Sequence, residues 1–147
     1  MRCAIMCVLA AGLFCVSSTA IQADNPVLSD TLANLRIDGE VYAVALQDDG
    51  KVIIGGGFDR VNDADRLYIA RLNTDGTVDT DWNPNADGLV TTLAVDGSAI
   101  YVGGSFTNIG GQARNCIARL NDIDGSADSW DPDADDMVYE IMPDNGS

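Results

Sequence analysis

The pentapeptide Ile69-Ala70-Arg71-Leu72-Asn73 recurs letter for letter at residues 117–121, an offset of 117 − 69 = 48 residues. Flanking stretches recur at the same offset without a gap: Gly-Gly-Gly-Phe at 55–58 with Gly-Gly-Ser-Phe at 103–106, Trp-Asn-Pro at 82–84 with Trp-Asp-Pro at 130–132, and Ala-Asp at 86–87 with Ala-Asp at 134–135. The chain is therefore predicted to be a repeat array, in which each copy is one supersecondary unit that stacks on its neighbours.

Each copy begins with two apolar runs joined by a turn. Residues 41–46 and 52–54 flank Asp48-Asp49-Gly50, and residues 89–95 and 99–102 flank Asp96-Gly97-Ser98. Apolar runs separated by Asp and Gly are typical of β-hairpins. Because the runs do not alternate between apolar and polar residues, we expect both faces of each hairpin to be covered.

Three further segments complete each copy. We expect a polar loop (59–65 and 107–113), a third strand (66–73 and 114–121), and a short fourth strand that ends at Trp82 or Trp130, near a proline without a backbone donor. Four short strands and a period in the forties are typical of propeller blades. The predicted fold class is all-β: propeller blades of four antiparallel strands, with two complete 48-residue repeats, the start of a third, and an incomplete ring.

The predicted organisation follows from these boundaries. Residues 1–23 form a secretory signal peptide, 24–40 a lead-in that by hypothesis supplies a closing outer strand, 41–88 and 89–136 two blades, and 137–147 the truncated start of a third. The last segment stops inside a hairpin turn, which favours an amino-terminal fragment of a longer protein. The alternative is a short chain whose strand is completed by another subunit.

Residues 1–23 combine Arg2, an apolar run at 4–16 and small residues before Ala20 and Ala23, the two expected cleavage sites. A membrane anchor is the alternative, but this run is shorter than the ~20 residues that span a bilayer. Cleavage would remove three cysteines (Cys3, Cys7 and Cys15) and leave Cys116 without an internal disulfide partner.

The chain is strongly acidic, with 8 basic and 23 acidic residues and a net charge of −15. Only Arg2 lies before residue 24, so the mature chain would carry 7 − 23 = −16. Such a charge opposes binding to nucleic acid and to anionic membranes. It favours solubility, cation binding or a salty habitat, and composition does not rank these three.

The order of these motifs resembles the delta-60 repeat: Gly-Gly-x-Phe, a loop with Gly110-Gly111-Gln112-Ala113-Arg114, then Ile-Ala-Arg-Leu-Asn, Asp-Gly and an aromatic-x-Pro. The resemblance covers about residues 30–147 and implies a β-propeller of unknown function in secreted and surface proteins of bacteria. The chain departs from that pattern in using Trp82 and Trp130 where Phe is more usual, and in its acidic turns at 79–87 and 128–136.

The sequence contains no histidine, so the usual catalytic triad and most zinc sites are excluded. We predict no catalytic and no cofactor-binding residues. Asp131, Asp133 and Asp135 are weak calcium candidates because they place carboxylates at alternate positions, but an EF-hand loop would need Glu where Met142 stands. Turn formation is the competing explanation for these residues.

The remaining repeated side chains are predicted to be structural. Arg71 and Arg119 lie in mid-strand between apolar neighbours, so each guanidinium is expected to meet a carboxylate or a carbonyl between blades or at a rim. The aromatic residues (Phe58, Phe106, Trp82 and Trp130) are expected to pack between blades, and stacking of the tryptophans on carbohydrate is the alternative.

The leading hypothesis is a secreted, extracellular or cell-surface, non-enzymatic interaction module, with the periplasm as an alternative location. Its loops at 59–65 and 107–113 would present a surface to a protein or carbohydrate ligand. Further blades of the same full-length chain are the other expected partners. Two alternatives stay open: a propeller enzyme whose site is assembled from missing blades, and a structural cell-surface spacer.

Overall fold

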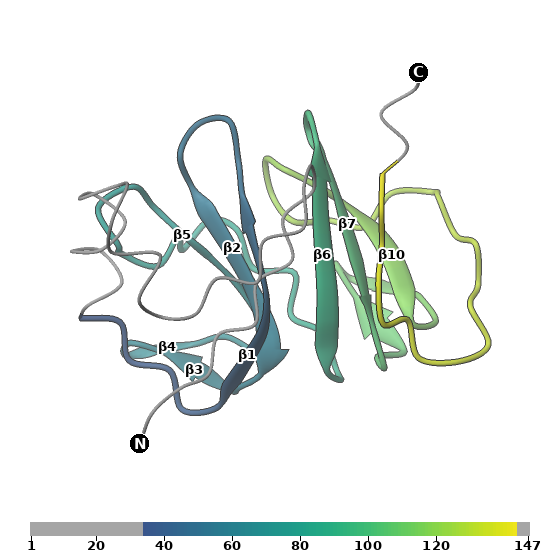
Figure 1. Ribbon diagram of the computed structural model, residues 1–147, viewed down its shortest axis with the longest axis horizontal. Helices are drawn as coiled ribbons and strands as arrows, with labels where there is room; N and C mark the ends of the chain where they lie inside the picture. Colours follow the sequence, from purple (N-terminus) through teal and green to yellow (C-terminus); the bar gives the residue numbers. More distant parts are fainter. Residues whose placement is uncertain (1–33, 144–147) are drawn as a thin grey trace.

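The computed structural model describes residues 34–143, and within that range the chain is all-β and contains no helix (Figure 1). Ten short strands follow one another: β1 Glu40–Leu46, β2 Val52–Gly57, β3 Arg60–Val61, β4 Ala64–Asp65, β5 Ile69–Leu72, β6 Val90–Asp96, β7 Ala99–Gly104, β8 Asn108–Ile109, β9 Gln112–Ala113 and β10 Ile117–Asn121. The described range therefore has no helix long and apolar enough to cross a bilayer.

The strands form two equivalent antiparallel sheets that stand side by side (Figure 1). Sheet 1 has the order β1-β2-β5 and sheet 2 the order β6-β7-β10, and each carries a two-stranded hairpin, β3–β4 or β8–β9. Strands β1 and β2 pack against β6, so the sheets stack face to face. Several small antiparallel sheets in this arrangement are consistent with an incomplete β-propeller.

A β-bulge marks the same place in both sheets, opposite the glycine cluster that ends β2 or β7. The register shifts between Val41 and Ala43 in sheet 1 and between Val90 and Thr92 in sheet 2. A Cβ on Gly104 would lie 1.9 Å from the carbonyl oxygen of Leu89. The close approach of the two backbones therefore requires glycine at this position.

The third strands begin later than the predicted residues 66 and 114. Tyr68 and Cys116 have φ angles of 63° and 60°, in the left-handed region, so the extended conformation starts only at Ile69 and Ile117. The predicted fourth strand is reduced further, because each copy forms only an isolated bridge, Leu72 with Val78 or Leu120 with Ala127. Next to each bridge, one further backbone bond joins the segment to the third strand, from the Asp79 N–H to Arg71 O (2.8 Å) or from the Asp128 N–H to Arg119 O (3.1 Å).

The repeat does not keep one offset throughout. Strand β1 aligns with β6 at an offset of 49, since the Val41/Ala43 bulge corresponds to Val90/Thr92, whereas Gly55 and Gly103 remain 48 apart. One residue is therefore lost in the second hairpin turn. It is regained in the turn after the third strand, because Asp79 and Asp128, the partners of the repeated arginines, are 49 apart. The offset of 48 residues holds for the landmark motifs, Trp82 and Trp130 included, but the expectation that it applies without a gap to β1 and to the turn after the third strand was wrong.

The segments predicted as polar rim loops, 59–65 and 107–113, are short hairpins with one buried anchor each. Val61 in β3 and Ile109 in β8 are almost completely buried. Asn62 and the pair Gly110-Gly111 have positive φ, which a tight hairpin turn requires. A single apolar residue in each otherwise polar segment thus fixes the hairpin to the sheet.

The core is divided into two clusters. The larger lies between the sheets and contains Trp82 and Phe106 together with residues from all six long strands. The smaller lies on the other face of sheet 1 and contains Phe58, Val61 and Leu72. The predicted packing role is confirmed for Trp82 and Phe106, but Phe58 belongs to the smaller cluster.

Both ends of the described range pack on the sheets. Ile37 forms an antiparallel bridge with Val61, so the lead-in lies along β3. Residues 137–143, expected to begin a third blade, form no assigned strand and run along β6 and β7. The predicted signal peptide with its cleavage sites and three cysteines, residues 24–33 of the lead-in, and the final turn at 144–147 lie outside the described residues.

Candidate functional site

Hairpins β3–β4 and β8–β9 occupy equivalent positions after β2 and β7, and each is fixed by an aspartate from the preceding linker. In the second copy, the Asp87 carboxylate accepts hydrogen bonds from the backbone N–H groups of Thr107 (2.7 Å) and Asn108 (2.9 Å). It also accepts bonds from Thr107 Oγ1 and Asn108 Nδ2, both at 2.7 Å. Burial works to raise the pKa of Asp87, but these four bonds outweigh it and hold the pKa well below the usual range.

Asp38 has the same function in the first copy. Its carboxylate accepts the N–H groups of Asp59 (3.0 Å) and Arg60 (2.8 Å), and its pKa is lowered mainly by the bond from Arg60. Asp38 and Asp87 are 87 − 38 = 49 residues apart, and each precedes a glycine, Gly39 or Gly88. The end of the lead-in therefore corresponds to the linker between the sheets, at an offset of 49 residues.

The second strand of each hairpin, β4 or β9, is held by the same arrangement in both copies. Arg66 donates from Nη1 to its neighbour's carbonyl, Asp65 O (2.7 Å), and from Nη2 to Asp79 O (3.1 Å). Arg114 donates in the same way to Ala113 O and Asp128 O. Each arginine thus ties its hairpin to the segment that leaves the third strand, and the shared scaffold has three parts: an aspartate cap, an apolar anchor and an arginine tie.

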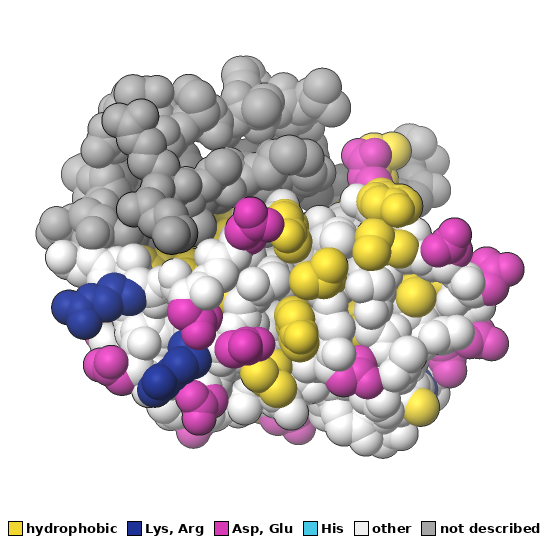
Figure 2. Space-filling model, turned by 90° about the horizontal axis from the view of Figure 1, so that it is seen from below, with side chains coloured by type: hydrophobic (Ala, Val, Ile, Leu, Met, Phe, Trp, Pro, Cys, Tyr) yellow, Lys and Arg dark blue, Asp and Glu magenta, His cyan; other side chains and the backbone are white. Residues whose placement is uncertain are grey.

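The exposed side chains on this scaffold differ between the two hairpins. The first exposes Asp59, Arg60, Asp63 and Asp65, and Arg60 pairs with Asp65 at 3.2 Å. The second exposes uncharged residues: Thr107, Asn108, Gly111, Gln112 and Ala113. Figure 2 views the molecule from the side on which β3–β4 lies in Figure 1. It shows the large basic side chains gathered toward one side, acidic groups around the face and a band of hydrophobic side chains across it.

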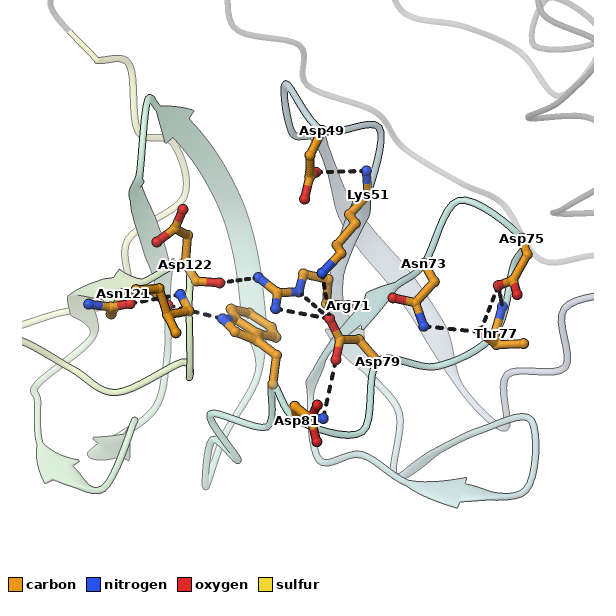
Figure 3. A network of polar contacts seen from close by, with 12 residues as sticks. Asp49, Lys51, Arg71, Asn73, Asp75, Thr77, Asp79, Asp81, Asn121 and Asp122 are labelled. Carbon is orange, nitrogen blue, oxygen red and sulfur yellow. Dashed lines mark hydrogen bonds and ion pairs between the residues drawn. The ribbon is translucent and has the colours of Figure 1, made fainter.

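A second polar cluster lies between the sheets and is built around Asp79 (Figure 3). Asp79 Oδ2 accepts bonds from Arg71 Nε (2.9 Å) and Lys51 Nζ (3.1 Å). Burial works to raise the pKa of Asp79, but the bond from Lys51 and the charge of Arg71 lower it overall. The carboxylate is therefore held ionised as a partner of two cations.

Arg71 and Trp82 connect this cluster to sheet 2. The Arg71 guanidinium lies 5.0 Å from the Trp82 ring centroid and donates to the carbonyl of Asp122. Trp82 Nε1 donates to the carbonyl of Asn121 (3.0 Å). Arg71 was predicted to meet a carboxylate or a carbonyl between blades or at a rim. It meets both kinds of partner: the carboxylate of Asp79 in its own copy and the carbonyl of Asp122 in the neighbouring sheet.

The predicted carboxylate partner of Arg119 is confirmed as well, because Arg119 Nε donates to Asp128 Oδ2 at 2.6 Å. Its guanidinium lies 5.8 Å from the Trp130 ring centroid, and Tyr101 meets the same ring edge to face at 5.4 Å. Trp130 is only partly buried, whereas Trp82 is fully buried. Each tryptophan thus stacks with the arginine of its own copy, but only Trp82 is fully buried.

The three calcium candidates are exposed side chains on the segment after Trp130. Arg114 reaches Asp131 at 3.5 Å, and Asp133 has a φ of 51°, which matches a turn. Among residues 34–143, no group of three or more His, Cys, Asp or Glu side chains is arranged to hold a metal ion. Whether Asp131, Asp133 and Asp135 bind calcium is a question for titration with calcium while the melting temperature is followed.

Sequence reasoning missed the caps Asp38 and Asp87 and the ties Arg66 and Arg114. Two repeated sequence features could have identified them: the dipeptide Asp-Gly at 38–39 and 87–88, and an arginine before each third strand, at 66 and 114. The offset of 49 for the aspartates hid the first of these from a comparison at 48.

Two segments of the chain, residues 47–81 and 99–129, match a family described as a domain of unknown function (DUF5122) beta-propeller. The segments cover corresponding parts of the two sheets, which supports a β-propeller repeat family. No curated protein and no solved structure matches the chain significantly.

Proposed function

We propose that the chain is part of a β-propeller of the delta-60 repeat type that acts as a non-enzymatic binding module outside the cytoplasm. The family match supports the propeller, and the features of residues 1–23 support export. The acidic composition, with 23 acidic against 8 basic residues, favours a ligand other than nucleic acid.

One observation carries the binding role: two hairpins share a scaffold and differ in the side chains that they expose. The aspartate cap, the buried Val61 or Ile109 and the arginine tie recur in both copies. The exposed residues change from charged in β3–β4 to uncharged in β8–β9. Rigid supports that present variable short loops are a common design of binding surfaces.

A non-enzymatic role is supported by the bonding of the repeated ionic groups. Asp79 and Asp128 bind arginines, and Asp38 and Asp87 cap hairpins, so each has a structural use that recurs in both copies. The ligand class that we propose is a protein or a carbohydrate, bound at the exposed polar side chains of the two hairpins.

A binding screen with hairpin variants tests this function. The chain would be applied to a printed glycan array and to purified matrix proteins, as wild type and with Arg60→Ala or Gln112→Ala. Asp48→Ala is the matched control, because Asp48 is exposed in the turn at the opposite end of β1 and β2. We expect hairpin variants to lose retention and the control to keep it, and equal retention by all variants would refute the proposal.

A further inference from the structure

The last glycine of the first cluster, Gly57, is not required by the backbone. A Cβ on Gly56 would lie 2.0 Å from Glu40 O, so the approach of two backbones fixes that glycine. The atoms nearest to a Cβ on Gly57 are instead side-chain atoms, the closest at 3.1 Å. The second copy has Ser105 at this position, 105 − 57 = 48 residues further on, so the fold accepts a side chain here. The glycine at 57 therefore needs another explanation.

The space beside Gly57 is occupied by two side chains, one from each sheet. Leu89, which precedes β6, places Cδ2 3.1 Å from the Cβ position. Tyr42 of β1 places Cε2 at 3.5 Å and its hydroxyl oxygen at 3.6 Å from the same position. Both side chains are partly exposed. They form a small apolar floor at the seam between the sheets, at the end where β2 leads into the β3–β4 hairpin.

A carboxylate borders this floor and orients the aromatic ring. Tyr42 Oη donates to Glu40 Oε2 at 2.5 Å, and this bond raises the pKa of Tyr42, so the phenol stays protonated. Within residues 34–143, Tyr42 is the only hydrogen-bond donor to the Glu40 side chain, which is exposed. An ionised carboxylate accepts several hydrogen bonds at once. Glu40 therefore holds the ring and keeps acceptor positions for a ligand.

Glu40 and Tyr42 do not belong to the repeated scaffold. At the offset of 49 residues that aligns β1 with β6, their equivalents are Leu89 and Thr91. Thr91 Oγ1 donates to a backbone carbonyl, that of Val138 (2.5 Å), and not to a carboxylate. The aspartate caps and arginine ties that build the fold recur in both copies. A carboxylate–phenol pair that occurs in only one copy is therefore not needed to build the sheet.

We propose that Glu40, Tyr42 and Leu89 form a carbohydrate-binding site, in which one sugar ring of a glycan without acidic groups stacks on Tyr42 and donates hydroxyl groups to Glu40. An oriented aromatic ring offers apolar area at low entropic cost, and a carboxylate is a strong acceptor for hydroxyl donors. A few polar groups beside an apolar surface are typical of small-ligand sites. The inference rests on the proposed binding role and narrows its ligand class to carbohydrate.

The surroundings of the site select among ligands. Asp38 and Asp59 are exposed at the same end of sheet 1, and acidic groups lie around this side of the molecule (Figure 2), so an acidic sugar is opposed. A protein partner needs about 800 Å² of surface on each side of a stable interface. One aromatic ring, one leucine and one carboxylate match the size of a sugar unit better.

Retention on immobilised glycans tests the site. The probes are cellopentaose, chitopentaose and the pentamer of glucosamine, with the pentamer of galacturonate as the acidic comparison. Tyr42→Ala, Glu40→Gln and Gly57→Ser, which installs the residue of the second copy beside Tyr42, should each weaken retention on a non-acidic probe by about tenfold or more. Tyr139→Ala and Glu140→Gln are the matched controls, since both residues are exposed on another segment, and should be retained like wild type.

The outcomes separate this site from the hairpins. Because Glu40 is exposed, Glu40→Gln keeps the fold and decides the question even if Tyr42→Ala unfolds. Absence of wild-type retention on every non-acidic probe would overturn the inference, as would retention that Glu40→Gln leaves unchanged. Loss of retention with Arg60→Ala or Gln112→Ala but not with the Tyr42 and Glu40 variants would assign the ligand to the hairpins and refute this site. The reverse pattern would establish this site and refute the role of the hairpins.

Discussion

Replacement of Trp82 is the most direct perturbation of the contact that joins the two sheets. The side chain is fully buried, stacks with Arg71 and donates one hydrogen bond, to Asn121 O at 3.0 Å. Trp82→Phe removes the donor but leaves that carbonyl bonded to the Gly125 N–H at 3.0 Å. The acceptor is therefore not orphaned by the substitution.

The expected cost follows from these contacts. The lost hydrogen bond should destabilise by about 0.5–1.5 kcal/mol, as is typical when the partner remains satisfied. The smaller ring leaves a gap in the inter-sheet core and should add about 1 kcal/mol. We expect Trp82→Phe to lower the free energy of unfolding by about 2 kcal/mol, and Trp82→Ala by about 3–5 kcal/mol.

Trp130 provides the matched control, since it keeps the arginine neighbour but is only partly buried. Trp130→Phe should change the free energy of unfolding by less than about 1 kcal/mol, as expected for a residue outside the core. Urea denaturation followed by far-UV circular dichroism measures both variants under identical conditions. Equal destabilisation by the two substitutions would refute the argument that the sheet-to-sheet contact, and not the repeat position, determines the contribution of the tryptophan.

Three other predictions concern the glycine cluster, the hairpin caps and the acidic turn. Gly104→Ala places a Cβ only 1.9 Å from the Leu89 carbonyl oxygen and should lower the free energy of unfolding by more than about 2 kcal/mol. The Cβ of Gly97→Ala meets no atom within 4 Å, so this variant should cost only about 1 kcal/mol, for its φ of +56°. Similar midpoints in urea for the two variants would contradict the steric explanation. The folded-state pKa of Asp87 is depressed, so its contribution to stability is complete above the unfolded-state pKa of about 3.9 and is lost as the pH falls through the folded-state value. Asp87→Asn should therefore cost about 1 kcal/mol at pH 7 and reduce the loss of stability below about pH 4, and a mutant with an unchanged acid profile would exclude this role. Asp96→Asn, at an exposed strand end, is the control and should change stability at pH 7 by less than about 0.5 kcal/mol. Calcium at millimolar concentration should leave the Tm unchanged, since Arg114 already pairs with Asp131 at 3.5 Å and the turn explains Asp133, and a saturable increase in Tm that Asp133→Asn abolishes would establish a calcium site instead.

The sequence predicts the central hairpins well because their determinants are local. Apolar runs with Asp and Gly between them place β1 and β2 to within a few residues. The mid-strand arginines likewise predict carboxylate partners, and Asp79 and Asp128 fill that role. These features follow from turn residues between apolar runs and from the cost of burying an unpaired charge, and both can be recognised in the sequence.

Other features depend on tertiary contacts that the letters do not state. Tyr68 and Cys116 adopt positive φ although neither is Gly or Asn, and this delays β5 and β10. The polar segment 107–113 forms a hairpin because one residue, Ile109, is buried and Asp87 satisfies two of its N–H groups from a distant linker. Propensity alone favours a loop there, and long-range capping decides otherwise.

Identical residues at equivalent positions of the two copies contribute unequally to stability, because the contribution comes from the contact between the sheets. Arg71 and Arg119 both bind a carboxylate and stack on tryptophan, yet the Arg71 side chain is 5% exposed and that of Arg119 33%. Within residues 34–143, Arg71 also donates to a carbonyl of the neighbouring sheet, that of Asp122. Stability in such an array is approximately a sum of unit terms and nearest-neighbour terms. It follows that a mutation of Arg71 or Trp82, at the contact between the two sheets, should destabilise both sheets, whereas the same mutation of Arg119 or Trp130 should have a smaller effect.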